Sequence, residues 1–231
     1  MHCAIADPVV STVLDRLHGE AEVEMLGFSE RRRFGLPRLR RRRPAGPVDW
    51  EAARAVYRDK YISLEREQGN LLYLLARSLG ATRAAEFGTS FGISTIYLAA
   101  AMRDNGGGLA LGSEIEPTKA AVANENLALA GLAEYAEVRV GDARETLADP
   151  GGPLDLVLID GFPHLNLTML QLLAPHLSPG GIVMADNVGS FPREMGPYVD
   201  WVQDPANGFR STTLPLRGGT ELSVRMAPAS A

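Results

Sequence analysis

The chain has 231 residues, 45% of them hydrophobic and 22% charged, which is typical of one large globular domain or of a domain with an appended arm. Its formal net charge of −5 excludes nucleic-acid binding that is driven by overall charge. Cys3 is the one cysteine, so an internal disulfide is excluded and we expect a reducing compartment. The sequence shows no signal-peptide pattern and no apolar run of about 20 residues, which predicts a cytoplasmic protein.

The first 60 residues are predicted to form a helical, Arg-rich arm. A short amphipathic helix is expected from Pro8 to Glu20, and a second helical block over about residues 49–60. Between them, residues 31–43 hold eight arginines and no acidic residue, and a Pro/Gly breaker follows at 44–47. Because like charges repel, we expect this tract to be mobile or docked on an acidic surface, such as that of a second subunit in a homodimer.

A third helix is predicted from Ser63 to Leu79, with Gly80 as its C-cap, and from there strands alternate with helices, most clearly a helix over 165–177. This alternation implies right-handed crossovers and a parallel sheet that is covered on both faces. The last two predicted strands are separated by a short turn rather than by a helix, which predicts an antiparallel hairpin. The predicted strands span residues 83–87, 108–115, 136–140, 154–160, 181–186, 209–216 and 220–226.

Ligands of such sheets bind outside the carboxyl ends of the strands, and the first of these ends is followed by the turn "GTSFG". Gly88 and Gly92 allow a tight turn, but their G-x-x-x-G spacing departs from the G-x-G-x-x-G of NAD-binding proteins. At the end of the second strand, Glu114 is placed to accept hydrogen bonds from ribose hydroxyls. The alternative is a solvated acid in a loop. A third strand end places Asp142 where it could border a nucleobase.

Two later strands end in acidic residues, Asp160 and Asp186, and Asn187 follows the second one. Because neighbouring strands lie about 5 Å apart, the two carboxylates could share a divalent cation. Two carboxylates and an amide oxygen suit Mg²⁺ or Ca²⁺ rather than zinc. The alternative is that "DNV" forms an Asx turn and that Asp160 contacts substrate or cofactor. The sequence offers no nearby lysine, so His164 is the one cation that we expect close to the pair.

Five segments, taken in chain order, resemble the motifs of class I S-adenosylmethionine-dependent methyltransferases. They are "EFGTSFGIST", "SEIEP", "GDARE", "LIDG" and "SPGGIVMADNV". They look most like the cation-dependent O-methyltransferases of the catechol and caffeoyl-CoA type, and the resemblance covers about residues 60–228. It implies an α/β fold with a Rossmann-like, seven-stranded methyltransferase sheet over residues 61–231, preceded by the arm of residues 1–60.

The resemblance also implies roles for individual residues. In the family's pattern Glu86, Gly88 and Ser94 line the methionine end of the cofactor, and Glu114 binds its ribose. Ala143 and Arg144, next to Asp142, border the adenine. Asp160, Asp186 and Asn187 match the metal triad, and Asp160 also counts as a catalytic and cofactor-binding residue. The family usually has a lysine base three residues after the first metal-binding Asp, but this sequence has Pro163 there, and the adjacent His164 could replace it.

We therefore expect methyl transfer from S-adenosylmethionine to a hydroxyl of a small phenolic or catechol-like acceptor, with Mg²⁺ or another divalent cation stabilising the oxyanion. Because the metal does most of the deprotonation, the family lysine is dispensable. One alternative is an RNA methyltransferase acting on tRNA hydroxyuridine, with the Arg-rich arm binding phosphates. Another is a metal-independent small-molecule methyltransferase. A third is a non-enzymatic domain that binds the cofactor only to stabilise an oligomer.

Overall fold

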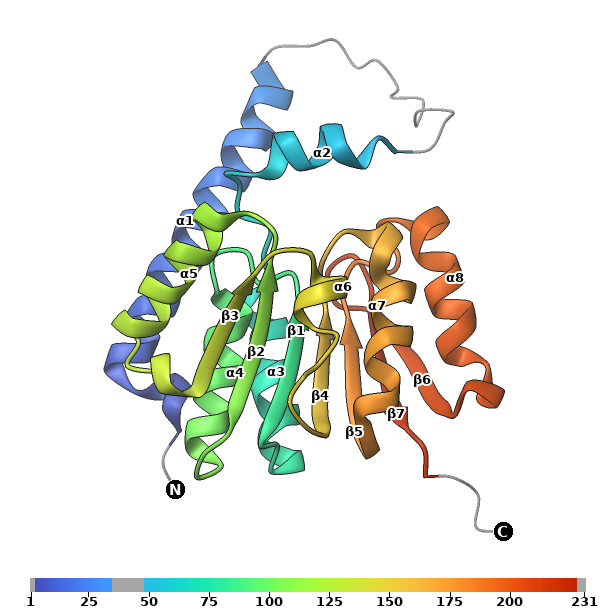
Figure 1. Cartoon of the computed structure of the whole chain (residues 1–231). Helices are drawn as coiled ribbons and strands as arrows, with labels where there is room; N and C mark the ends of the chain where they lie inside the picture. Colours follow the sequence, from blue (N-terminus) through green and yellow to red (C-terminus); the bar gives the residue numbers. More distant parts are fainter. Residues whose placement is uncertain (1–2, 35–47, 228–231) are drawn as a thin grey trace.

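The structure is a computed structural model that describes residues 3–34 and 48–227, with the backbone alone for residues 25–34. Its centre is one seven-stranded sheet of order β3-β2-β1-β4-β5-β7-β6 (Figure 1). The first five strands in chain order run parallel to one another, and β7 is antiparallel to both β5 and β6. The strands are β1 (Arg83–Phe87), β2 (Leu109–Glu114), β3 (Ala136–Val140), β4 (Leu154–Ile159), β5 (Leu177–Ala185), β6 (Phe209–Leu214) and β7 (Thr220–Arg225). The predicted α/β fold, including the C-terminal hairpin, is confirmed.

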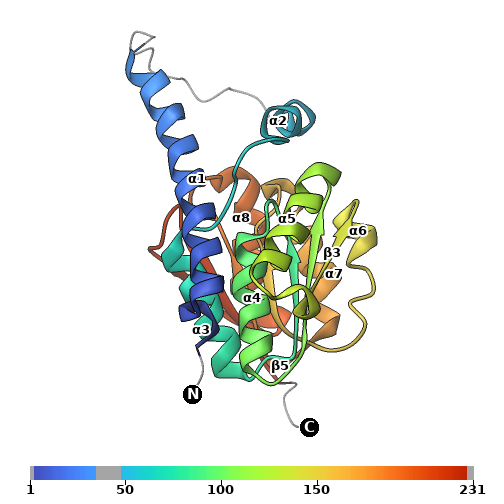
Figure 2. The same cartoon turned by 90° about the vertical axis from the view of Figure 1, so that its left-hand side faces the viewer.

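Helices cover both faces of the sheet, because the central strands are apolar on both sides (Figure 2). Leu156 and Leu158 of β4 belong to one buried cluster, and the alternating Val157 and Ile159 belong to the other. The first cluster includes residues of α1, α3 (Arg66–Leu79), α4 (Ile93–Asp104) and α5 (Pro117–Leu129). The second includes residues of α6 (Ala143–Thr146), α7 (Asn166–Leu173) and α8 (Pro192–Gln203).

The first helix, α1, runs from Pro8 to Phe34, so the expected end at Glu20 was wrong. The residues after Glu20 are mostly good helix formers with no proline, and the helix continues into the Arg-rich tract. Val10, Leu14 and Leu17 are buried in the same cluster as α4, so the first half of α1 is part of the core. The rest of the tract lies outside the described residues. The division of the chain at residue 60 stays a prediction.

The second helix, α2 (Trp50–Tyr57), has no buried residue and lies beyond the edge of the sheet to which the parallel strands point (Figure 1). Asp49 caps its first turn, and the Arg54 guanidinium forms an ion pair with Glu116 at 2.6 Å. Within the described ranges, no helix has the length and apolar character of a membrane span.

Two other helix boundaries differ from the predicted ones. Helix α3 begins at Arg66 rather than Ser63, because Glu65 and Gln68 form a capping box. Its end at Leu79, with Gly80 in the left-handed region at φ 60°, is confirmed. Helix α7 ends at Leu173 and continues as a short 3-10 turn to His176, since Pro175 lacks the N–H that an α-helix needs.

Candidate active site

The carboxyl ends of β1, β2, β4 and β5 meet at one edge of the sheet, and the first of them carries a tight glycine turn. Gly88 has a φ of 101°, and a Cβ there would lie 2.5 Å from the carbonyl oxygen of Asp160. Ser90 also has a positive φ of 51°, so the loop folds back before α4 begins. A side chain at residue 88 would push β1 and β4 apart, which explains the glycine.

Glu86, at the end of β1, is fully buried and forms no ion pair with the residues that the structure describes. Its Oε2 accepts hydrogen bonds from the hydroxyls of Thr89 and Thr95, whereas Oε1 is buried and has no partner in the described part of the chain. Burial raises the pKa of Glu86, and hydrogen bonds from Ser94 and the two threonines oppose that rise. A buried acceptor without a donor indicates a missing donor, such as an ammonium group. Glu86 therefore fits the methionine end of the cofactor.

Glu114, at the end of β2, is 7% exposed and held by two backbone donors. Its Oε2 accepts from the N–H of Ser90 at 2.8 Å, and its Oε1 accepts from the N–H of Glu116 at 2.9 Å. Each carboxylate oxygen has a further lone pair, so both can still accept from a diol. The glycine turn and Glu114 are thus directly connected.

Asp142, Ala143 and Arg144 follow β3 and form the first turn of α6. Asp142 is the N-cap, and its carboxylate accepts from the backbone N–H and the guanidinium of Arg144. Ala143 is buried and the Arg144 side chain is largely exposed. These contacts hold the turn, but none of them indicates a ligand by itself.

The two acidic strand ends lie side by side, one residue beyond β4 and β5. The N–H of Asp160 donates to Phe87 of β1, and the N–H of Asp186 donates to Ile159 of β4. Burial, followed by the charges of Asp186 and Glu86, raises the pKa of Asp160 well above its ordinary value. Burial also raises the pKa of Asp186. Asp186 is buried and Asp160 is half-buried. Two such carboxylates that disfavour one another's charge are the donor set that a divalent cation stabilises.

Asn187 has a φ of 62°, which lets its amide turn back towards Asp186. Its Nδ2 donates to Asp186 Oδ2 at 2.6 Å. Oxygen and nitrogen of an amide occupy similar volumes, so a half-turn of this amide would present Oδ1 instead. No group of three or more His, Cys, Asp or Glu side chains in the described residues forms a metal site. A cation between the two aspartates would therefore need the Asn187 oxygen or water as further ligands.

The structure adds Arg217, in the turn between β6 and β7, to this acidic pair. Its charge lowers the pKa of both aspartates, and its Nε lies 3.2 Å from the Glu65 carboxylate. The expectation that His164 is the one cation near the pair was therefore wrong. No pattern in the sequence points to Arg217, because the hairpin lies about 30 residues beyond Asp186 and reaches it only in the folded sheet.

A cluster of aromatic rings connects α2 with the loops that follow Asp160 and Asp186. The Trp50 ring stacks on His164 with centroids 4.8 Å apart, and lies 5.9 Å from Phe162 and 6.2 Å from Phe191. Burial lowers the pKa of His164, although its side chain is exposed on one side. His164 was predicted from the sequence, but Trp50 was not, because its position on a separate helix gave no signal.

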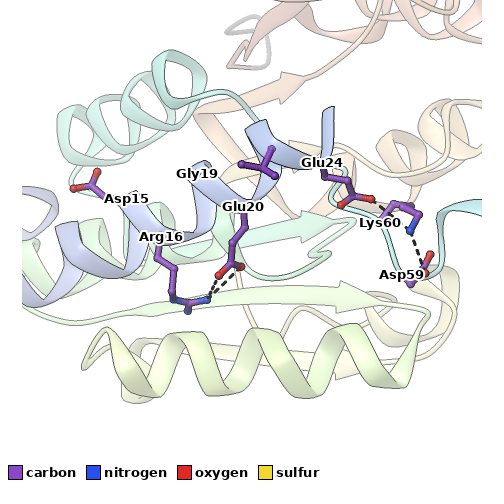
Figure 3. Close-up of a pocket in the computed structure, with 8 residues that line it drawn as sticks. Asp15, Arg16, Gly19, Glu20, Glu24, Asp59 and Lys60 are labelled. Carbon is purple, nitrogen blue, oxygen red and sulfur yellow. Dashed lines mark hydrogen bonds and ion pairs between the residues drawn. The ribbon is translucent and has the colours of Figure 1, made fainter. Parts of the chain in front are cut away.

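A cavity of about 660 Å³ lies elsewhere, between α1 and the segment that follows α2 (Figure 3). Its charged side chains are arranged in pairs: Arg16 with Glu20 at 3.1 Å, and Lys60 with Glu24 at 3.6 Å and Asp59 at 3.2 Å. None of the residues predicted for the active site lines it.

The chain is similar in sequence to known methyltransferases. A family model described as a methyltransferase domain matches residues 85–188. The chain is 40% identical over 128 residues to a catechol O-methyltransferase of Mycobacterium tuberculosis, covering 55% of this chain and 57% of the relative. It is 36% identical over 131 residues to a catechol O-methyltransferase of Niastella koreensis, covering 55% and 58%. The chain therefore spans somewhat more than half the length of these relatives.

A solved structure is similar over nearly the whole chain. The cofactor-bound structure of Rv0187 from MTB superimposes with a TM-score of 0.67 and 27% identity, covering 90% of this chain and 98% of that one. The similarity therefore extends beyond the sheet into part of the predicted arm.

Proposed function

We propose that this chain transfers a methyl group from S-adenosylmethionine to a hydroxyl oxygen, on the basis of the methyltransferase-domain match and of its similarity to catechol O-methyltransferases. The acceptor that we infer is a small phenol or catechol, and a divalent cation assists. The observation that carries the proposal is the acidic pair beside a cluster of aromatic rings. Phe162 and Phe191 stand on the loops that follow the two aspartates, so an aromatic acceptor held by these rings has its hydroxyl groups near the carboxylates.

We assign the cofactor to the turn between β1 and α4. The unpartnered Glu86 oxygen would accept from its ammonium group, and Glu114 would accept from its ribose hydroxyls. Gly88 keeps the backbone of β1 close to that of β4, so that the cofactor and the acidic pair share one edge of the sheet. Alignment of the two reactants supplies much of the rate of such a reaction.

Asp160 and Asp186, with the Asn187 amide, would hold the cation. A divalent cation there would lower the pKa of the acceptor hydroxyl, which for a free phenol is about 10, and would stabilise the oxyanion. His164 is the candidate base: its lowered pKa keeps the ring neutral at pH 7 and able to accept a proton. Its stacking on Trp50 holds the ring beside the proposed acceptor site.

The test is a panel of catechols, other phenols and bulk tRNA incubated with labelled S-adenosylmethionine, with Mg²⁺ and with EDTA. We expect label in catechols, lost with EDTA and restored by Mg²⁺ or Mn²⁺. Full turnover in a metal-free preparation would exclude the cation and favour His164 as a base acting alone. Label in tRNA alone, with a steep salt dependence, would support the RNA alternative. Cofactor binding without any turnover would support a non-enzymatic domain.

A homodimer, predicted from the Arg-rich tract and the acidic remainder of the chain, is part of the proposal. Sedimentation of the purified protein tests it directly: a mass of one chain at all concentrations would exclude it. A cytoplasmic location likewise stays a prediction.

A further inference from the structure

We propose that Gln68 of α3 is a positioning residue that orients the Asp186 carboxylate for the cation. The inference rests on the proposed metal site and adds a residue that neither the sequence motifs nor the family pattern indicated. Gln68 is 1% exposed, and it is 118 residues away from Asp186 in the sequence. It would act through Asp186 rather than by touching the reactants.

The orientation of the Gln68 amide is fixed by the helix that carries it. Its Oε1 accepts from the backbone N–H of Glu65 at 3.1 Å, as the third residue of a capping box does. Because the oxygen must face that N–H, the Nε2 group must face the other way. There it donates to Asp186 Oδ1 at 2.6 Å and to Thr220 Oγ1 at 2.9 Å. Gln68 therefore cannot flip without losing its hydrogen bonds to Glu65 and Asp186, since an N–H cannot accept and a carboxylate cannot donate.

The consequence for Asp186 is that its two oxygens have different surroundings. Oδ1 is engaged by Gln68 in a buried setting, whereas Oδ2 faces the Asn187 amide. Rotation of the carboxylate would leave the buried Nε2–H of Gln68 without its acceptor, which is unfavourable. Gln68 thus leaves Oδ2 as the oxygen that is available to a cation together with Asn187.

The loop that carries Asp186 is also held from the opposite side. The N–H groups of Val188 and Gly189 donate to the carbonyl oxygens of Gly219 and Gly218 in the β6–β7 turn. Thr220, the second partner of Gln68, begins β7 directly after that turn and is fully buried. Gln68 therefore joins α3, the aspartate loop and the hairpin at one point, as outer residues of metal sites commonly do.

A capping role alone would also keep Gln68 buried, and the experiment must separate the two roles. The variants are Gln68→Met, which keeps the length but removes the amide, and Thr220→Val, which removes the hydrogen bond between Gln68 and Thr220 without touching Asp186. Mn²⁺ affinity is measured by titration calorimetry, independently of turnover, and S-adenosylmethionine affinity is measured on the same samples. Far-ultraviolet circular dichroism and thermal unfolding establish that each variant is folded.

We expect Gln68→Met to weaken Mn²⁺ binding by about 10–100-fold, the range seen for outer residues of metal sites. Thr220→Val should stay within about threefold of the parent, and S-adenosylmethionine affinity should change little in both. Should Gln68→Met not fold, Gln68→Asn keeps an amide that is one methylene too short to reach both Glu65 and Asp186, and should weaken Mn²⁺ similarly. Unchanged Mn²⁺ affinity in a folded variant at residue 68 would limit Gln68 to capping. A parent protein that binds no Mn²⁺ would overturn the metal site and this inference together.

Discussion

Carboxylates cluster in two regions of the molecule, and their surroundings differ between the two. At the sheet edge, Glu86, Asp160 and Asp186 are surrounded by protein, and burial raises the pKa of each. Along the cavity beside α1, Glu20 and Asp59 lie next to Arg16 and Lys60 near the surface (Figure 3). A carboxylate that is paired with a cation at the surface needs no further explanation, because the solvent and the partner satisfy it.

The difference favours the sheet edge over the cavity beside α1 as the proposed binding site. Burying charged groups without a matching cation destabilises the fold, so such groups persist where a ligand stabilises them. Arg217 is one cation beside two aspartates and also contacts Glu65, so the acid outnumbers the base at the sheet edge. The cavity beside α1 is therefore not the better candidate: the unbalanced charge at the sheet edge favours that edge as the proposed site.

The largest effect is expected from removing one aspartate of the pair. Asp186→Ala should lower turnover about 1,000-fold or more, since a cation supplies several kcal/mol of stabilisation to the developing oxyanion. Mg²⁺ or Mn²⁺ should no longer restore activity after EDTA, while S-adenosylmethionine affinity should be nearly unchanged. Initial rates and calorimetry check both parts.

The matched control is Asp59→Ala, which removes an exposed carboxylate from the cavity beside α1. We expect parental turnover and metal dependence from this variant. Equal losses in the two variants would mean that buried and paired carboxylates do not differ in function, and the comparison would fail.

The sheet could be predicted from sequence because its signals are local. Apolar runs bounded by glycine or proline gave β1 and β3 to the residue, and the acidic residues after β4 and β5 marked the site edge. Helix ends were less accurate, because they depend on side-chain caps such as the one formed by Gln68.

The contacts that complete the site could not be predicted, because they join residues far apart in sequence. Gln68 and Thr220 are 152 residues apart, and Trp50 reaches His164 from a separate helix. No local pattern distinguishes Trp50 from any other aromatic residue at the start of an amphipathic helix. Such pairs become visible once the order of the strands and the path of α2 are known.

A smaller effect is expected at the cofactor end of the same edge. Glu114→Ala should weaken S-adenosylmethionine binding by about 1.5–3 kcal/mol, the range for hydrogen bonds to a charged group. Calorimetry on the folded variant measures this, and binding of Mn²⁺ should be retained. An unchanged affinity would remove Glu114 from the site and leave its two backbone hydrogen bonds as its role.

The buried face of α1 gives the next prediction, because it holds a titratable group of its own. His18 is 6% exposed, and its Nε2 forms a hydrogen bond with the Tyr97 hydroxyl at 3.2 Å. Burial, followed by the positive charge of Arg66, lowers the pKa of His18 to about 4, and the negative charges of Asp15 and Glu67 oppose this shift. The unfolded chain binds a proton near pH 6.5 and the folded chain only near pH 4, so stability falls as the pH drops through this window. One pKa unit is 1.36 kcal/mol, so about 2 kcal/mol should be lost by pH 5.

Urea unfolding at pH 7 and pH 5 measures this loss, and His18→Gln, which does not titrate there, provides the control. Carboxylates shared by both proteins contribute equally, so the difference between the two pH dependences isolates His18. Parallel pH dependences in the parent and the variant would show that His18 does not couple α1 docking to pH.

The smallest effect is expected from Glu20, on the rim of the cavity. Its carboxylate accepts from Arg16 at 3.1 Å and from the Tyr61 hydroxyl, and its side chain is 44% exposed. Surface pairs of this kind contribute about 0–1 kcal/mol, so Glu20→Gln should change the free energy of unfolding by no more than that.

Tyr61 packs on Phe91, with ring centroids 4.4 Å apart, and Phe91 directly follows Ser90, whose N–H donates to Glu114. If Glu20→Gln weakens S-adenosylmethionine binding severalfold in calorimetry, this chain of contacts couples α1 to the cofactor turn, and the two regions are not independent. If S-adenosylmethionine affinity and turnover are unchanged, the paired carboxylates along α1 have no role in cofactor binding or catalysis, as their pairing indicates.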